Sequence, residues 1–290
     1  MPEAGTLAAA FVTAAGTLRK AGFETPELDA RLLLCHAAGL SHEAFVAGAR
    51  EALLPDAAAR LDGAIARRLE REPVARIAGV REFYGRRFAL GPKALDPRSD
   101  TETLIEAALD LAAKKGRQEK PLNLLDLGTG TGCVLVTLLA ELPLACGVGI
   151  DLCPDALALA AANARRHGVS SRANFIAADW LDATAGNFDL ILSNPPYIAA
   201  REIASLADEV AAYDPRLALD GGPDGLEAYR RIAARAPHGL AEDGRLLVEI
   251  GPAQSEAVAE IFAAAGLRRD EAGGVRLDLA GRPRVLVARR

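Results

Sequence analysis

The stretch Leu122-Asn123-Leu124-Leu125-Asp126-Leu127-Gly128-Thr129-Gly130-Thr131-Gly132 decides the fold of this chain. Its first half is an apolar run with the length of a buried strand, and its second half is a loop that contains three glycines. Glycine adopts backbone conformations that are closed to other residues and lets a ligand come close to the main chain. The stretch therefore predicts a strand over 122–127, a ligand-binding loop and a helix over 133–141.

Strand and helix patterns alternate after this loop. The expected strands cover 145–150, 173–177, 188–192 and 245–250, with weaker runs at 268–271 and 284–288, and the expected helices cover 155–167, 225–236 and 253–265. Before the loop, a further helix is expected over 102–114, followed by a polar connection over 116–120. Such alternation predicts an α/β fold, in which helices cover both faces of a mostly parallel sheet.

Three regions of the chain differ in composition. Residues 1–72 are rich in Ala, Leu and Arg, contain four short helical patterns and carry no strand signal, so they predict a small N-terminal helical domain. Residues 73–100 bring in aromatic residues, and two short extended runs flank Gly85-Arg86-Arg87, which predicts a linker with a β-hairpin. Residues 101–290 carry the α/β pattern and are expected to form the main domain.

The helical region has two interpretations. Its segment 26–38 is expected to place Leu28, Leu32 and Leu33 on one face and to end at Gly39. The region is either an extension of the scaffold or a module that docks a macromolecular partner. The sequence pattern by itself leaves both open.

The composition is that of an ordinary globular protein. The chain has 290 residues, of which 50% are hydrophobic and 25% are charged, and its net charge is −5. This acidic balance disfavours a dominant nucleic-acid surface, and no stretch reaches the length of a membrane span. The four cysteines form no Cys-x-x-Cys pair and have no histidine at metal-ligand spacing, so we expect reduced thiols, no bound metal and a cytoplasmic protein.

Acidic and aromatic residues follow two further expected strands. Asp151 comes after the second strand, where a carboxylate can accept both hydroxyls of a ribose. Asp179 and Trp180 come after the third, where they would meet the edge and the face of an adenine. The alternative is structural: Asp151 as a turn residue, Trp180 as filling for the edge of the core, and Asp126 as a loop anchor.

The expected strand over 188–192 runs into Ser193-Asn194-Pro195-Pro196-Tyr197. Two prolines fix φ and remove two backbone donors, so this loop is rigid and offers carbonyl acceptors without matching N–H groups. Asn194 adds a side-chain acceptor, and Tyr197 adds a flat face. The loop is therefore suited to hold a planar –NH2 group, although a proline-rich turn at a strand end is also common.

With these motifs, the chain resembles the class I S-adenosylmethionine-dependent methyltransferases. More narrowly, it is similar to the protein-(glutamine-N5) methyltransferases that modify peptide chain release factors, the PrmC/HemK family. The similarity covers nearly the whole chain and implies a Rossmann-like, seven-stranded methyltransferase domain. It rests on the glycine loop, on Asn194–Ile198, on Gly79 and on the segments 28–34, 39–41, 72–73, 82–83, 97–102, 213–215, 217–226 and 248–254.

The resemblance implies a role for each motif residue. The cofactor-binding residues would be those of the glycine loop, the ribose acid, the adenine pair and the amide of the proline-rich loop: Gly128, Thr129, Gly130, Thr131, Gly132, Asp151, Asp179, Trp180 and Asn194. The glycine loop would line the methionine part of the cofactor. Asn194 and the carbonyl of Pro195 would bind the substrate amide as the catalytic pair, and Pro196 and Tyr197 would shape its slot.

The implied reaction is methylation of the glutamine in the Gly-Gly-Gln motif of release factors, with S-adenosylmethionine as donor and S-adenosylhomocysteine as product. No dedicated histidine base stands near the loop, and the proton can leave after transfer. A monomer that docks the release factor through residues 1–72, without direct nucleic-acid contact, is expected. The alternatives are glutamine methylation of a ribosomal protein, N6-adenine methylation of nucleic acid, and a non-catalytic ribonucleotide-binding module.

Overall fold

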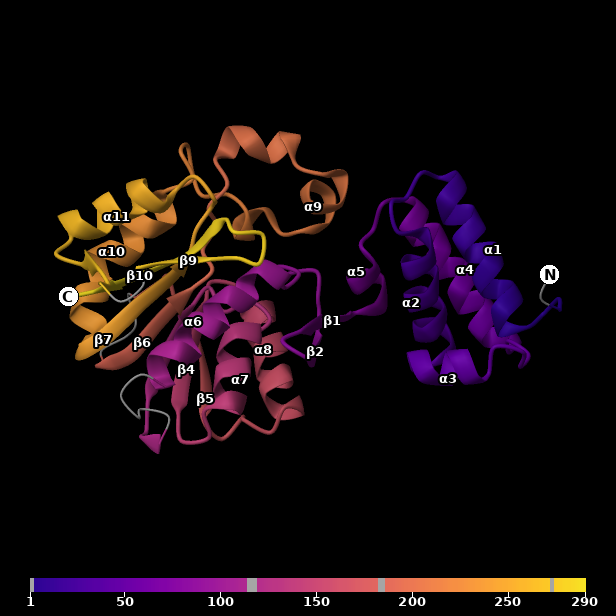
Figure 1. Ribbon diagram of the computed structural model, residues 1–290, viewed down its shortest axis with the longest axis horizontal. Coiled ribbons are helices and arrows are strands. Elements are labelled where there is room, and N and C mark those ends of the chain that lie inside the picture. Colours follow the sequence, from indigo (N-terminus) through magenta and orange to yellow (C-terminus); the bar gives the residue numbers. More distant parts are fainter. Residues whose placement is uncertain (1–2, 114–118, 182–185, 272–273) are drawn as a thin grey trace. The chain divides into compact units, whose positions relative to one another are not determined.

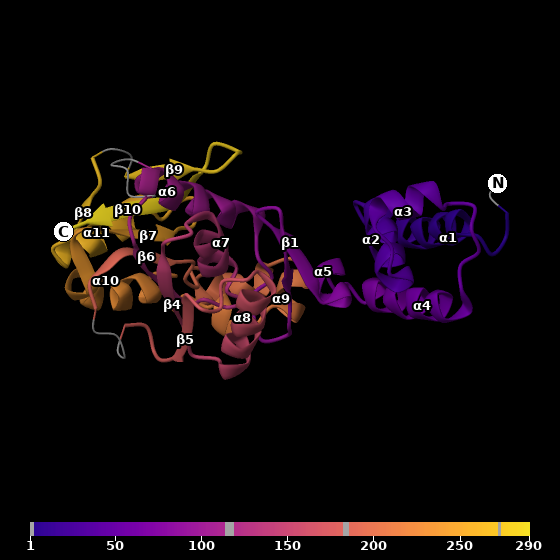
Figure 2. The same ribbon diagram turned by 90° about the horizontal axis from the view of Figure 1, so that it is seen from below.

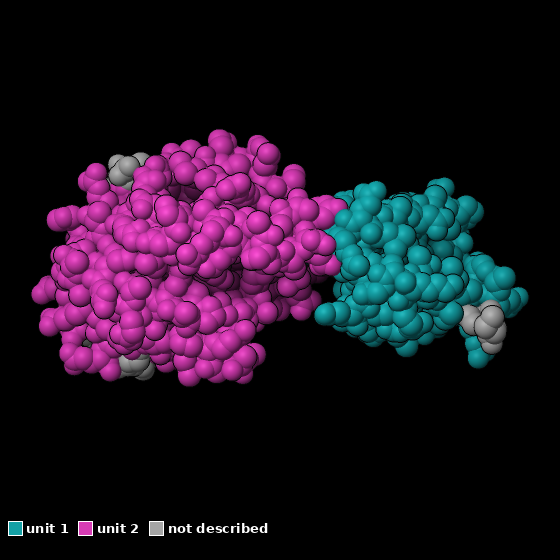
Figure 3. Space-filling view, turned by 90° about the horizontal axis from the view of Figure 1, so that it is seen from above, with its two compact units in different colours: residues 1–80 teal, residues 81–290 magenta. Residues whose placement is uncertain are grey.

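The computed structural model describes residues 3–113, 119–181, 186–271 and 274–290. The chain divides into two compact units, Met1–Val80 and Arg81–Arg290, each with hydrophobic clusters of its own (Figures 1 and 3). The sequence predicts that domains end after residues 72 and 100, and these two domain boundaries stay predictions. Among the described residues, no helix is both long enough and apolar enough to cross a membrane.

The first unit is helical throughout its described part. Its helices are α1 (Leu7–Lys20), α2 (Pro26–Ala38), α3 (His42–Ala47), α4 (Pro55–Leu69) and α5 (Val74–Ala78). The sequence predicts the first four but not α5, which is too short to show a helical period. The single face predicted for three leucines of α2 is wrong, because Leu33 is fully buried whereas Leu28 and Leu32 are 42% and 44% exposed.

The predicted β-hairpin is present as strands β1 (Val80–Phe83) and β2 (Arg86–Ala89). Its turn is formed by Tyr84 and Gly85, both with positive φ, so the two arginines that the sequence places in the turn belong to β2 instead. A two-residue turn with positive φ at both positions matches the twist of the flanking strands. Phe83 and Phe88 are buried in the core of the second unit.

The second unit is built on one mixed sheet. Its strands are β3 (Asn123–Leu127), β4 (Cys146–Asp151), β5 (Ala173–Ala177), β6 (Phe188–Ser193), β7 (Leu240–Glu249), β8 (Arg268–Arg269), β9 (Val275–Leu277) and β10 (Pro283–Arg289). Within the described residues, the order β5-β4-β3-β6-β7-β10-β8 gives the predicted seven strands, and β9 adds an eighth by pairing with β10. The strands from β5 to β7 are parallel, whereas β10 runs antiparallel to its neighbours.

Alternate residues of the strands fill two hydrophobic cores, one on each face of the sheet. Leu124 packs into the core beneath α6 (Glu102–Ala113) and α7 (Cys133–Glu141), and α8 (Pro154–Arg166) lies on the same face. Leu125 packs into the other core, beneath α10 (Glu227–Gly239) and α11 (Ser255–Ala264) (Figures 1 and 2). The predicted helix over 133–141 is confirmed residue for residue, and Lys114, which ends the helix predicted over 102–114, lies outside the described residues with most of the 116–120 connection.

The order of the strands positions the site. The chain adds β4 and β5 on one side of β3 and then crosses to add β6 and β7 on the other. In such sheets the crevice beyond the carboxyl ends of the strands, at the point where the order reverses, is where ligands bind. Between β6 and α10 the chain forms two short 3₁₀ helices, Ala200–Ser205 and Arg216–Ala218, and the helix α9 (Asp208–Tyr213), which the sequence does not predict.

Candidate functional site

A cavity of about 720 Å³ opens at the carboxyl ends of β3, β4, β5 and β6. Its lining includes nine residues that the sequence predicts for the site: Gly128, Thr129, Gly130, Thr131, Asp151, Asp179, Trp180, Asn194 and Pro196. Three predicted residues, Gly132, Pro195 and Tyr197, do not line it. The segments 92–97 and 215–218, to which the sequence assigns no role, also contribute to the wall.

The glycine loop is held by main-chain hydrogen bonds. The N–H groups of Gly128 and Thr129 both donate to the carbonyl of Ile150, at 2.9 and 2.8 Å. Gly128 has φ +72°, and a Cβ built there would meet no atom within 4 Å, because it would project into open space. At Gly132, with φ +77°, a Cβ would lie 3.0 Å from the Cβ of Ala160 in α8. One glycine thus leaves room at the cavity, and the other allows close packing of helices.

Asp151 ends β4 and is held in place by two backbone donors. Its Oδ2 accepts a hydrogen bond from the N–H of Gly130, and its Oδ1 accepts one from the N–H of Cys153, both at 2.9 Å. Each carboxylate oxygen can accept a further hydrogen bond. The two interpretations of Asp151 are therefore compatible, because the residue stabilises its turn and also lines the cavity.

Asp126, at the end of β3, also lines the cavity but is almost fully buried. The hydroxyl of Thr129 donates to its Oδ2 at 2.6 Å. Burial raises the pKa of Asp126 to about 6, against the opposing effect of the Thr129 hydrogen bond. Asp126 thus fixes the glycine loop, as the anchor interpretation predicts, and also presents a titratable group to the cavity.

Asp179 and Trp180 lie side by side in the sequence after β5 and both line the cavity. The Oδ2 of Asp179 pairs with Arg231 of α10, whereas its Oδ1 is buried and has no hydrogen-bond partner among the described residues. Trp180 has φ +53°, a conformation that is costly for a bulky residue and that tends to occur at functional sites. Trp180 also packs against the core beneath α10, so it belongs to both the core and the wall.

Asn194 follows β6, and its side chain is tied to a residue 93 positions earlier. Its Nδ2 donates to the hydroxyl oxygen of Thr101 at 3.1 Å. Asn194 lines the cavity, and its Oδ1 accepts no hydrogen bond from the described residues. This geometry leaves a carbonyl acceptor for an N–H donor, which is the chemistry predicted for this loop.

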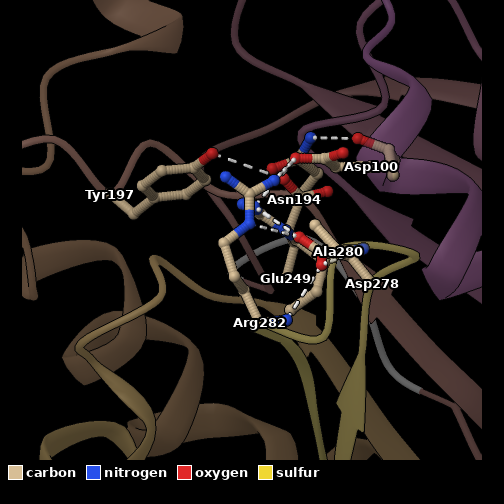
Figure 4. Close-up of polar contacts among 9 residues, drawn as sticks. Asp100, Asn194, Tyr197, Glu249, Asp278, Ala280 and Arg282 are labelled. Carbon is tan, nitrogen blue, oxygen red and sulfur yellow. Dashed lines mark hydrogen bonds and ion pairs between the residues drawn. The ribbon is translucent and has the colours of Figure 1, made fainter.

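The rest of the proline-rich loop is fixed from behind. The carbonyl of Tyr197 accepts a hydrogen bond from the side-chain Nε2 of Gln254 at 2.9 Å. A Cβ at Gly225 would lie 2.4 Å from that carbonyl, so only glycine allows this approach. The phenol hydroxyl of Tyr197 donates to Oε1 of Glu249 at 3.4 Å, away from the cavity (Figure 4). The segments around 225 and 254, which the sequence gives no role, therefore hold the loop.

The segment 97–102 also receives a structural role that sequence reasoning missed. Arg98 pairs with the buried Asp214, Asp100 pairs with Arg284, and Glu102 accepts a hydrogen bond from the N–H of Tyr84. These contacts hold Thr101 against Asn194. In the sequence, only the family resemblance points to this segment, and it does not indicate which residues the segment contacts.

This arrangement defines the chain as a methyltransferase of the Rossmann-like class, and comparison with known proteins bears this out. Residues 9–79 match the family described as PrmC N-terminal domain, and residues 118–261 match the family described as methyltransferase domain. A release factor glutamine methyltransferase of Rhodospirillum rubrum is 48% identical over 94% of this chain and 82% of its own length. One of Cereibacter sphaeroides is 50% identical over 94% of both chains.

The chain therefore belongs to the release factor glutamine methyltransferase family. A solved methyltransferase structure from Pyrococcus furiosus is 13% identical, has a TM-score of 0.49, and covers 71% of this chain and 89% of its own.

Proposed function

We propose that this protein transfers the methyl group of S-adenosylmethionine to the side-chain nitrogen (N5) of the glutamine in the Gly-Gly-Gln motif of peptide chain release factors. The observation that carries the proposal is the orientation of Asn194. Asn194 lines the cavity and its Nδ2 is bound to Thr101, which leaves its Oδ1 as an unused acceptor for a substrate N–H. An enzyme that methylates an amide needs such an acceptor, because the amide nitrogen arrives as a donor.

The residues present fit the proposed cofactor. Gly128 leaves open space beside its backbone, and Asp151 presents carboxylate oxygens that can accept ribose hydroxyls. Asp179 and Trp180 both line the cavity, where the unpartnered Oδ1 of Asp179 suits the exocyclic amine of an adenine and the flat ring of Trp180 suits its face. When bound, S-adenosylmethionine supplies an electrophilic methyl group and leaves as S-adenosylhomocysteine.

The protein's own contribution is to orient and polarise the amide. An amide nitrogen is a poor nucleophile, because its lone pair is shared with the carbonyl group. Hydrogen bonds from its N–H groups to Asn194 Oδ1 and to the Pro195 carbonyl would fix the plane of the amide and increase the electron density on nitrogen. Pro195 does not line the cavity, so its carbonyl is an acceptor that the family resemblance alone implies. The same acceptors stabilise the positive charge that develops on nitrogen during transfer. Fixing the nitrogen in line for attack contributes much of the remaining acceleration.

The substrate assignment draws on the relatives and on the first unit. Relatives named release factor glutamine methyltransferase align with this chain over nearly its whole length, including the helical residues. We propose that residues 1–72 dock the release factor, and that the enzyme acts as a cytoplasmic monomer. The methyl-transfer site would accept another amide or amine equally well, because Asp179, Trp180 and Asn194 do not distinguish between such groups. The identity of the substrate therefore needs its own test.

The test is methyl transfer from labelled S-adenosylmethionine to a purified release factor, with a Gln→Ala version of its Gly-Gly-Gln motif alongside. We expect label on the normal factor and none on the altered one. Label on a ribosomal protein or on DNA, with none on the release factor, would retain the cofactor and overturn the substrate. Absence of label on all of them would overturn the proposed reaction.

A further inference from the structure

One asparagine of α8 joins two segments of the chain that lead into the cavity wall. Asn163 is fully buried, and α8 lies beside the β-hairpin (Figure 1). The Oδ1 of Asn163 accepts a hydrogen bond from the N–H of Ala89 at 2.8 Å. Its Nδ2 donates to the carbonyl of Ala89 at 3.1 Å and to the carbonyl of Thr131 at 2.9 Å. Ala89 ends β2 shortly before the lining segment 92–97, whereas Thr131 belongs to the glycine loop.

The amide of Asn163 is matched to these three backbone groups. Burying an amide is costly unless it is hydrogen-bonded, and here the acceptor and the NH2 group are both used. A carboxylate of the same shape has no donor, and a leucine side chain of the same shape has neither donor nor acceptor. The N–H of Ala89 needs an acceptor and the two carbonyls need donors, so the amide has one orientation only. Asn163 therefore fixes the backbone of Thr131 relative to that of Ala89.

The packing of α8 brings both segments within reach of this amide. A Cβ at Gly132 would lie 3.0 Å from the Cβ of Ala160, and a Cβ at Gly91 would lie 3.5 Å from Cδ2 of Leu159. Ala160 and Asn163 lie about one turn apart, on the same face of the helix. Asn163 itself does not line the cavity, so its effect on a ligand passes through the segments that it holds.

Thr131 is the residue through which such an effect would pass. It lines the cavity, and its Oγ1 is buried without a hydrogen-bond partner among the described residues. Burial raises the pKa of the nearby Cys133 thiol to about 12, so this thiol stays protonated and is only a weak partner for the hydroxyl. A buried hydroxyl without a partner costs free energy, which a ligand in the cavity can recover by bonding to it.

We propose that Asn163 is a positioning residue for the cofactor: it fixes the backbone of Thr131 against that of Ala89, so that Thr131 presents its hydroxyl to S-adenosylmethionine. This inference rests on the proposed function of the cavity. Without the Asn163 amide, the carbonyl of Thr131 loses the partner that ties the glycine loop to β2. The binding conformation is then only one of several that the loop adopts, and the apparent affinity falls by the fraction of time spent in the others.

The first experiment measures the affinity for S-adenosylhomocysteine by calorimetry. Asn163→Leu keeps the branched shape and removes the hydrogen bonds, and we expect it to weaken binding about tenfold. Leu139→Ala is the control, because Leu139 is fully buried near the end of α7 and does not line the cavity. It should destabilise the fold and leave the affinity within about twofold of the wild type. Equal affinities for the wild type and Asn163→Leu would overturn the proposal, as would equal losses in the two variants.

The second experiment is a double-mutant cycle with Thr131→Val, which removes the hydroxyl and keeps the shape. Alone, Thr131→Val should weaken binding of S-adenosylhomocysteine about three- to tenfold, the effect of one hydrogen bond. If Asn163 acts through Thr131, the double variant should bind about as weakly as Asn163→Leu alone, within about twofold. A loss equal to the product of the two single losses would overturn the proposal, because a merely structural role of Asn163 gives that product.

The third experiment needs no ligand. In the wild type, the amide of Ala89 is protected from hydrogen exchange by its bond to Asn163. Asn163→Leu should speed exchange at Ala89 and in the glycine loop at least about tenfold, and Leu139→Ala should not. Unchanged exchange in the glycine loop would overturn the proposal. If Asn163→Leu does not fold, Asn163→Ser, which leaves room for water beside the freed carbonyls, takes its place in all three experiments with the same deciding outcomes.

These measurements separate the inference from the proposed function. If the wild type does not bind S-adenosylhomocysteine, the proposed function fails and the inference fails with it. If the wild type binds it and labels the release factor, but Asn163→Leu binds it equally well, the function stands and the inference alone is overturned. If Asn163→Leu binds weakly and Thr131→Val adds no further loss, both stand.

Discussion

The two halves of the cavity are built in different ways. On the side of β3 and β4, Gly128 and Asp151 are held by backbone groups of neighbouring strand ends, within about one strand-helix-strand repeat. On the side of β6, Asn194 is oriented by Thr101, which lies 93 residues earlier, and the loop behind it is held by Glu249 and Gln254. The first half follows from the order of the strands, whereas the second depends on side chains that only the tertiary structure brings together.

The largest effect that separates the halves is expected for Asn194→Ala. Removing one preorganised hydrogen-bonding group from a transition-state site lowers kcat by about 10²- to 10³-fold. Affinity for S-adenosylhomocysteine, measured by calorimetry, should fall far less than kcat, because Asn194 is only one of the residues expected to bind the cofactor and the strand ends on the other side of the cavity are unchanged. A comparable loss of cofactor affinity would contradict the division of the cavity into two halves.

This division also explains how much the sequence can predict. The strands, the helix over 133–141 and the positions of Gly128, Asp151 and Asn194 at one edge follow from periodicity and from the rule that parallel strands share their carboxyl ends. The hydrogen bond between Thr101 and Asn194 does not follow, because nothing local relates the two residues. Tyr197 illustrates the same limit: its ring is expected to shape the substrate slot, yet its hydroxyl contacts Glu249 outside the cavity.

The burial of the Glu249 carboxyl group, in the second half, should make the stability of the protein depend on pH. Because the native pKa of Glu249 is about 7 against an ordinary value of 4.5, the native chain holds a proton between these pH values that the unfolded chain has released. The free energy of unfolding therefore falls as pH rises through this window, by roughly 2–3 kcal/mol between pH 5 and pH 8.

Urea unfolding of the wild type and Glu249→Gln at both pH values checks this expectation. The variant lacks the ionisation, so its stability should fall less between pH 5 and pH 8 by the same roughly 2–3 kcal/mol. Asp126 has a raised pKa as well and contributes equally to both proteins, so it cancels in the comparison. Parallel pH profiles for the two proteins would show that Glu249 is ionised throughout.

The first half can be probed by filling the space that its glycine leaves. Gly128→Ala places a methyl group at φ +72° in open space beside the cavity, and Gly168→Ala is a matched control at φ +71°, also with no atom within 4 Å. Both variants should lose about 1–2 kcal/mol of stability from the left-handed conformation. Only Gly128→Ala should weaken binding of S-adenosylhomocysteine, by roughly tenfold, because only its methyl group occupies ligand space. Equal affinities in the two variants would place the cofactor elsewhere.

The smallest predicted effect concerns the first unit. It tests whether residues outside the cavity contribute to the binding of the whole release factor. Leu28 and Leu32 lie one turn apart on α2 and are both exposed, so together they offer a small apolar patch to a partner. The double change Leu28→Ser and Leu32→Ser should raise KM for an intact release factor about three- to tenfold and leave kcat unchanged, since removing a few buried methylene groups from an interface has an effect of this size. KM for a short Gly-Gly-Gln peptide should not change, because a peptide cannot reach a docking surface.

Leu279→Ser, at a fully exposed leucine between β9 and β10, is the control and should change neither value. If the double variant raises KM for the peptide as much as for the whole factor, the helical unit supports the fold of the enzyme and does not dock its substrate.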